Sequence, residues 1–248
     1  MDDVVLQDMI TQGKDCAVCD DCVVIRPKAI ADKLQGKLSE QDILRASQIM
    51  DKQITFSSVM FNLHTACAGL NCSNASKCAF RSIPTGSIDA DVMFVSKMPT
   101  EYETYIEASH TDVNGLFIAL ILDKMNVSRH KIYHTDFIKC HTNNLDEHSY
   151  NECVQQYFAR EVDMVNPKLI ICNGLPLLRS CVKSNIFTGL PEAVTYGKIY
   201  NAETRSGHHV NIMSIYDLDK VLQKTGDDYE KCKTELWGQL LTGFKSLG

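Results

Sequence analysis

Two groups of cysteines flank a strand-like stretch of this chain, and their side chains could bind a metal. Cys67, Cys72 and Cys78 precede the stretch, and Cys140 and Cys153 follow it. In a reducing compartment, thiolates that come together hold a metal or an iron–sulfur cluster more often than they form disulfides. Because the stretch and the sequence after it have the pattern of an α/β unit, we expect these thiolates to converge at one corner of the fold.

The other six of the eleven cysteines fall into two classes. One class is the C-x2-C-x2-C run of Cys16, Cys19 and Cys22. This run resembles the start of a ferredoxin motif without its fourth cysteine and proline. Either it forms a second metal site completed by Cys78, or it is a thiol-rich tail. The second class is predicted to consist of small buried hydrophobic side chains: Cys172, Cys181 and Cys232.

The composition is that of a soluble globular protein. The chain has 248 residues, of which 44% are hydrophobic, and this length allows a substantial core. Its acidic start lacks the basic region of a signal peptide. No apolar run approaches the roughly 18 residues of a transmembrane helix. We therefore expect a cytoplasmic protein without membrane association.

The net charge of −6 gives no overall attraction to nucleic acid, so binding to DNA would require a locally basic face.

The elements that would position these residues follow from the hydrophobic pattern. Short apolar runs predict buried strands at residues 92–96, 132–135, 168–173 and 210–215. Helices are predicted over residues 39–53, 115–125, 150–165 and 175–182, and after the last strand. Strands that alternate with helices predict a parallel sheet covered on both faces. We expect residues 1–60 to form an extension and residues 61–248 to form the main domain.

The order of these segments resembles the uracil-DNA glycosylase superfamily, in particular its iron–sulfur family 4 type. Residues 90–99 (ADVMFVSKMP) resemble the strand that leads into the family's "GEAPG" loop, and Asn114-Gly115 with the apolar helix after it resembles "AG..LL". Residues 133–140 (YHTDFIKC) are similar to "Y.TN.VKC", and residues 166–174 (NPKLIICNG) to "P..I..LG". The resemblance implies a three-layer α/β/α fold around a four-stranded parallel sheet. The ligand site would lie at the carboxyl ends of the strands.

The resemblance also implies a cofactor. Family 4 members bind a 4Fe–4S cluster through four cysteines, which correspond here to Cys67, Cys72, Cys140 and Cys153. The first pair departs from the family pattern because its spacing is CxxxxC rather than CxxC. Cys78 therefore competes for a place in this pair. Soft thiolates also suit zinc, which stays the alternative to the cluster.

A catalytic and base-binding set is carried over from the same resemblance. Glu103 falls where the family has an acid after its loop, and Tyr216 lies near the place of the histidine in the family's "HP" motif. Pro99 belongs to the loop. Asp136 takes the position of the asparagine that reads the base, and His110 that of the aromatic ring on which the base stacks.

Several of these positions depart from the family pattern. Residues 96–100 read SKMPT in place of GEAPG, which removes both glycines and the close backbone approach that they allow. An ionised Asp136 can only accept hydrogen bonds, so it cannot donate to a uracil carbonyl as an amide does. It would suit a base that presents an amino group, or it would have to be protonated.

Contacts with DNA are predicted for four cations: Lys97, Arg129, Lys131 and Lys139.

Two main functions are compatible with this sequence. The first is a DNA glycosylase that extrudes uracil or a modified base and hydrolyses its N-glycosidic bond. The second is a catalytically inactive glycosylase-like subunit that binds DNA, assists replication or repair proteins and is stabilised by an iron–sulfur cluster. The altered loop and the missing histidine favour the second. A third option is a metal-stabilised α/β protein unrelated to DNA.

Overall fold

The computed structural model describes residues 82–128, 131–142 and 146–247, together with Ser39, Gln41 and Leu44. Several predictions lie outside these residues. They are the body of the 39–53 helix, the cysteine-rich extension, the role of Arg129, and the ligands Cys67 and Cys72 with their competitor Cys78.

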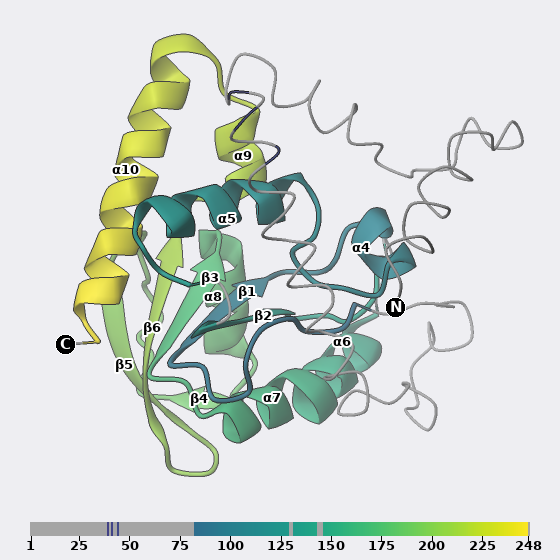
Figure 1. Ribbon diagram of the computed structural model, residues 1–248. Coiled ribbons are helices and arrows are strands. Elements are labelled where there is room, and N and C mark those ends of the chain that lie inside the picture. Colours follow the sequence, from purple (N-terminus) through teal and green to yellow (C-terminus); the bar gives the residue numbers. More distant parts are fainter. Residues whose placement is uncertain are drawn as a thin grey trace, which may run out of the picture.

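A six-stranded mixed sheet forms the centre of the fold (Figure 1). Four parallel strands run side by side in the order β2 (Ile132–Asp136), β1 (Val92–Ser96), β3 (Leu169–Asn173) and β6 (His209–Ile215). β5 (Ile199–Thr204) pairs antiparallel with β6, and β4 (Phe187–Thr188) pairs antiparallel with β5.

The α/β class and the four predicted strands are confirmed, but the predicted total of four strands is wrong. β5 alternates between exposed or half-exposed and buried residues, as a half-exposed antiparallel strand does. It therefore lacks the continuous apolar run by which the parallel strands were predicted. β4 has only two residues and leaves no periodic signal.

Helices cover both faces of the sheet. One face carries α5 (Val113–Lys124), α9 (Leu218–Leu222) and α10 (Gly226–Lys245). The other carries α6 (Glu147–Cys153), the π-helical segment η3 (Val154–Phe158), α7 (Ala159–Val165) and α8 (Leu175–Lys183). The short helix α4 (Glu101–Tyr105), which was not predicted, follows the carboxyl end of β1. In the part of the chain that is described, no helix is long and apolar enough to cross a membrane.

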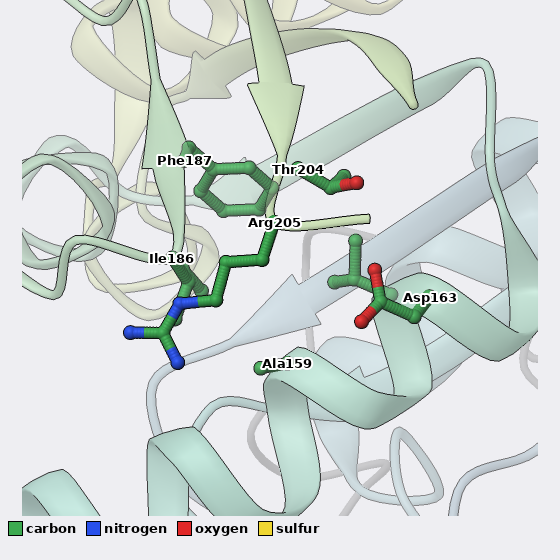
Figure 2. Close-up of a pocket in the computed structure, with 7 residues that line it drawn as sticks. Ala159, Asp163, Ile186, Phe187, Thr204 and Arg205 are labelled. Carbon is green, nitrogen blue, oxygen red and sulfur yellow. The ribbon is translucent and has the colours of Figure 1, made fainter. Parts of the chain in front are cut away.

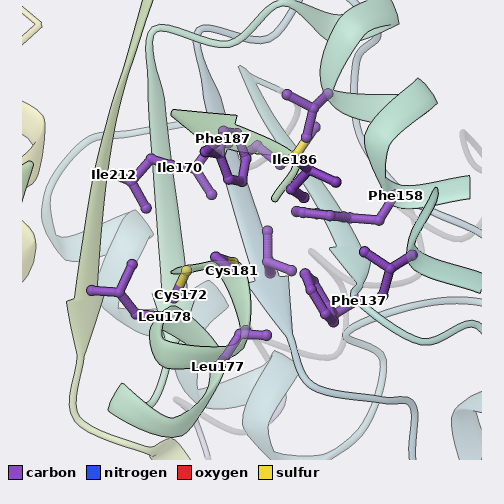
Figure 3. Packing of buried hydrophobic residues seen from close by; sticks show 14 of the residues in the cluster. Phe137, Phe158, Ile170, Cys172, Leu177, Leu178, Cys181, Ile186, Phe187 and Ile212 are labelled. Carbon is purple, nitrogen blue, oxygen red and sulfur yellow. The ribbon is translucent and has the colours of Figure 1, made fainter. Parts of the chain in front are cut away.

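The core consists of two hydrophobic clusters separated by the sheet, because successive strand residues face opposite sides. Figure 3 shows the cluster under α8, where Ile170, Cys172 and Ile212 of the strands meet Leu177 and Leu178. The predicted burial of Cys172 and Cys181 is confirmed. Cys232 is half-buried and packs at the edge of the other cluster.

The first turn of α5 leaves no room for a side chain at Gly115. A Cβ atom there would lie 1.9 Å from the carbonyl oxygen of His110. We expect Gly115→Ala to lower the free energy of unfolding by about 3 kcal/mol, as strongly overpacked core substitutions do. In the matched control Gly238→Ala, within α10, an added Cβ meets nothing within 4 Å. That change should raise stability by about 0.5–1 kcal/mol, because alanine favours helix. Equal stabilities of the two variants in urea unfolding would contradict this account of α5.

Candidate functional site

The carboxyl ends of β1 and β3 form the point where the strand order reverses. The chain passes from β1 to β2 on one side and then to β3 on the other side of β1. Open α/β sheets bind ligands at such a switch point. Here Ser96 ends β1 and Asn173 ends β3, and Asn173 Nδ2 donates to Ser96 Oγ over 3.3 Å. Ser96 Oγ also lies 2.9 Å from His110 Nε2. Three polar side chains thus meet where the topology favours a ligand.

Asn173 is a candidate site residue that the sequence analysis missed. Its Oδ1 accepts a hydrogen bond from the backbone N–H of Leu218, the first residue of α9, over 3.0 Å. This bond fixes the orientation of the carboxamide. Asn173 could have been identified from the sequence, because it is a polar residue that ends a predicted strand and precedes a glycine.

Asp136 ends β2 and is completely buried. Its Oδ2 accepts hydrogen bonds from Ser82 Oγ over 2.7 Å and from Ser109 Oγ over 2.6 Å, and the two hydroxyls also contact each other. Burial raises the pKa of Asp136, while the Ser109 hydrogen bond and the charge of Lys139 oppose that rise. Asp136 is therefore held inside the protein in the conformation described. The two serines had no recognisable signal in the sequence.

His110, which was predicted to stack on a base, is only 2% exposed. Its ring centroid lies 5.1 Å from that of Phe94 and 5.1 Å from that of His134. Its backbone has a left-handed φ of 57°. Because neighbouring aromatic rings pack against it, His110 does not present a ring face to a base in this conformation.

Glu103, the predicted catalytic acid, belongs to the capping box of α4. Its Oε2 accepts hydrogen bonds from the backbone N–H and the hydroxyl of Thr100, over 2.8 and 3.1 Å. Its Oε1 accepts from the backbone N–H of Thr111 over 3.2 Å. Burial, together with the charges of Asp112 and Asp136, raises the pKa of Glu103 well above its usual value. Both carboxylate oxygens therefore hold the loop between β1 and α5.

Tyr216, the predicted hydrogen-bond donor, is engaged by α10. Its hydroxyl donates to Glu235, and this bond is the main reason why the pKa of Tyr216 rises to about 12. Its ring packs edge-on against Tyr196. Pro99, the predicted loop contact, is buried, and its carbonyl accepts a hydrogen bond from His141 Nδ1 over 3.1 Å. Both residues are thus engaged by contacts within the protein in this conformation.

The three predicted cations that the structure describes, Lys97, Lys131 and Lys139, do not lie on one face. Lys97 is exposed just after β1, whereas Lys131 is exposed just before β2. β1 and β2 are parallel and paired residue by residue, so the two lysines lie at opposite ends of the strands, about 20 Å apart. Lys139 is buried, with its Nζ 2.6 Å from Glu161 Oε1 and 2.5 Å from Thr135 Oγ1. In this conformation the Lys139 ammonium is paired with Glu161 away from the surface, so contact of Lys139 with DNA stays a prediction that this geometry does not favour.

The predicted ligands Cys140 and Cys153 lie at one buried corner. Both belong to the same hydrophobic cluster, and Cys153 Sγ accepts the backbone N–H of Lys139, the residue before Cys140, over 3.5 Å. The carbonyl of Lys139 accepts the backbone N–H of Ser82 over 2.9 Å, so Ser82 also lies at this corner. Among the described residues no group of three or more potential ligands forms a metal site. Cys140 and Cys153 therefore supply two buried sulfur atoms, which are donors of the soft kind that zinc and iron–sulfur clusters take.

A small hollow lies elsewhere, between α7 and the strands β4 and β5 (Figure 2). Phe187 and Ile186 form its apolar wall, and Asp163 and Arg205 carry the charges around it. The register of β5 and β6 places this hollow at the amino ends of the parallel strands. It is therefore separate from the switch point.

One protein family matches the chain. The family described as the uracil DNA glycosylase superfamily matches residues 83–241, which include all six strands and the switch point. No curated protein matches the chain.

Proposed function

The chain belongs to the uracil-DNA glycosylase superfamily, and we propose that it is a glycosylase-like protein that binds DNA but has lost ordinary uracil excision. The observation that carries this proposal is the state of Asp136. A uracil-reading residue must donate to a carbonyl oxygen at a pocket that the extruded base can enter. Asp136 has an acceptor side chain, is fully buried, and is bonded to two serine hydroxyls of the protein itself.

The other positions assigned by the resemblance support the same proposal. Glu103 is buried and uses both oxygens to cap α4 and to hold Thr111, so its carboxylate is committed to the fold of this loop. Tyr216 directs its hydroxyl to Glu235 of α10. The glycines of the loop are absent, and Pro99 is buried. Removal of a single hydrogen-bond donor at a transition state costs about a hundredfold to a thousandfold in rate, so the combined departures favour a binding role.

A second candidate function is excision of a base other than uracil. It is favoured by the polar group at the switch point, where an amide carries two N–H donors and Asn173 bonds to Ser96 through Nδ2. A base with acceptor groups at its edge would suit these donors. A panel of oligonucleotides with modified bases would reveal this activity as release of one base, and we expect Asn173→Ala to abolish any such release.

The direct test of the proposed function uses a single-stranded oligonucleotide that contains one uracil. We expect the purified protein to bind this oligonucleotide and to leave the uracil in place. The absence of binding at low salt would contradict the DNA-binding role, and efficient uracil release would contradict the loss of excision.

DNA should approach the carboxyl edge of the sheet, so Lys97 should contribute to binding. We expect Lys97→Glu to weaken binding at least about threefold and to lower the slope of log K against log salt by about 0.7, the value for one phosphate contact to single-stranded DNA. Lys131→Glu is the matched control, because Lys131 is also exposed but lies at the opposite edge. Fluorescence anisotropy over a salt series measures both effects. Equal losses for the two variants would mean that DNA does not bind specifically at the carboxyl edge.

We further propose that Cys140 and Cys153 supply two ligands of a 4Fe–4S cluster, with Cys67 and Cys72 as the other two. Both described cysteines lie in one buried cluster, and Cys153 Sγ accepts the backbone N–H of Lys139, the residue before Cys140, which supports this proposal. When bound, the cluster would link the segment before Ser82 to the end of β2 and to α6. Zinc remains the alternative, because thiolates bind both.

A further inference from the structure

Lys139 and Glu161 form an ion pair that is unusually deep for charged side chains. Their side chains are 3% and 2% exposed, and the Nζ–Oε1 distance is 2.6 Å. Thr135 closes the group, because its hydroxyl lies 2.5 Å from Lys139 Nζ and donates to Glu161 Oε2 over 2.6 Å. Burying two charges costs solvation, which such a pair recovers only through close geometry and further hydrogen bonds. A buried pair is therefore weak evidence for stability alone and suggests a role in fixing local geometry.

The backbone of Lys139 connects the segments that carry Cys140 and Cys153 and also contacts Ser82. Its N–H donates to Cys153 Sγ over 3.5 Å, its carbonyl accepts the N–H of Ser82 over 2.9 Å, and Cys140 is the next residue. A shift of Lys139 would therefore disturb each of these segments.

The helical segment between Cys153 and Glu161 has an irregularity that bears on the same geometry. Residues 154–158 form a π-helical turn between α6 and α7. Such turns occur mostly as isolated bulges, frequently at functional sites, and they change the register of the residues that follow. Cys153 and Glu161, on either side of this turn, are both buried. The helix thus presents a sulfur and a carboxylate to the same region around Lys139.

We propose that the ion-pair group of Lys139, Glu161 and Thr135 is a positioning device that holds Cys140 and Cys153 in place for a metal or cluster. The group joins the end of β2 to α7. Lys139 fixes the two cysteines because Cys140 is the next residue and the Lys139 N–H donates to Cys153 Sγ. Its link to the cluster rests on the proposed function, whereas its effect on the two thiols does not. None of the three residues was assigned this role by the sequence analysis.

The test compares Lys139→Met with Lys168→Met in full-length protein. Lys168 also forms an ion pair, with Asp91 over 3.0 Å, but both side chains are more than half exposed. The first readout is the iron and sulfide content of protein purified without oxygen. The second is the rate at which iodoacetamide alkylates Cys140 and Cys153 in chelator-treated protein, followed by mass spectrometry. The second readout needs no bound cluster.

We expect Lys139→Met to lower metal affinity about tenfold to a hundredfold, as loss of a group that orients a ligand does. Alkylation of both cysteines should rise about tenfold because the corner opens locally. Lys168→Met should match the wild type in both readouts. Wild-type iron content and alkylation rates in Lys139→Met would overturn the proposal. If the wild type held no metal, the cluster proposal would fail, while faster alkylation would still support the positioning role.

A double variant covers the case in which Lys139→Met leaves a buried, uncompensated Glu161 and does not fold. Lys139→Met combined with Glu161→Met removes both charges, and such replacements are often tolerated in the folded state. We expect this variant to fold, to bind metal poorly and to alkylate quickly at Cys140 and Cys153. Wild-type behaviour of the folded double variant would overturn the proposal.

Discussion

Replacing Cys140 or Cys153 by alanine should reduce the iron and sulfide content of anaerobically purified protein to less than about one tenth of the wild-type content. Each cysteine supplies one of four thiolates in the proposed cluster, and a 4Fe–4S cluster requires all four positions. The two side chains lie in the same buried cluster, close to the Lys139 N–H group that contacts Cys153 Sγ. Metal and sulfide analysis, together with the visible absorbance of the protein, measures the effect.

Cys172→Ala is the matched control for these variants. Cys172 lies in β3, is fully buried and belongs to the same hydrophobic cluster, so its replacement removes a similar volume. We expect it to cost some stability but no iron. Unchanged iron in the Cys140 and Cys153 variants would contradict the ligand assignment. A colourless protein with one zinc ion per chain would replace the cluster by the zinc alternative.

The wild-type protein should release uracil from single-stranded DNA at least about a thousandfold more slowly than a superfamily member that retains its catalytic loop. Two lost functions contribute, because each missing transition-state donor costs about a hundredfold or more. The base-reading position holds a buried acceptor, Asp136, and the hydroxyl that replaces the catalytic imidazole, that of Tyr216, is bonded to Glu235. Release of radiolabelled uracil under single-turnover conditions measures the rate.

Asp136→Ala distinguishes a true low activity from a contaminating enzyme. A contaminant would release uracil equally from preparations of the wild type and of the variant. Activity that belongs to this chain and depends on Asp136 would disappear in the variant. Rapid uracil release by the wild type that disappears in Asp136→Ala would show that the chain is an active uracil-DNA glycosylase.

The sequence predicted those parts of the fold that depend on local hydrophobic pattern. Residues 92–96 and 168–173 are continuous apolar runs, and they form β1 and β3 almost as predicted. The apolar segment after Gly115 forms most of α5. β5 was missed because its alternating pattern is that of a half-exposed strand.

The site was harder to predict because its contacts join residues far apart in the chain. Asp136 was correctly placed at the end of a strand, but its burial depends on hydroxyls 54 and 27 residues away, from Ser82 and Ser109. Lys139 was expected to be exposed because it is a cation. Its burial is explained by the ion pair with Glu161, which lies 22 residues further along the chain in α7. Asn173 is different, since the rule that identified Asp136 as a strand-end residue applies to it equally.

Side chains at the carboxyl edge of the sheet are bonded and packed against one another. Asn173 bonds to Ser96, Ser96 contacts His110, and His110 packs against His134. Gly115 allows the helix α5 to approach the backbone of His110 closely. These contacts tie the loop before α5 to the ends of β1 and β3.

The most direct measurement follows binding and uracil release in the same sample, with one labelled single-stranded oligonucleotide that carries a single uracil. We expect a saturable, salt-dependent complex in which the uracil remains attached for much longer than the lifetime of the complex. Rapid release of the uracil by the wild type, abolished in Asp136→Ala, would contradict a DNA-binding protein that has lost uracil excision.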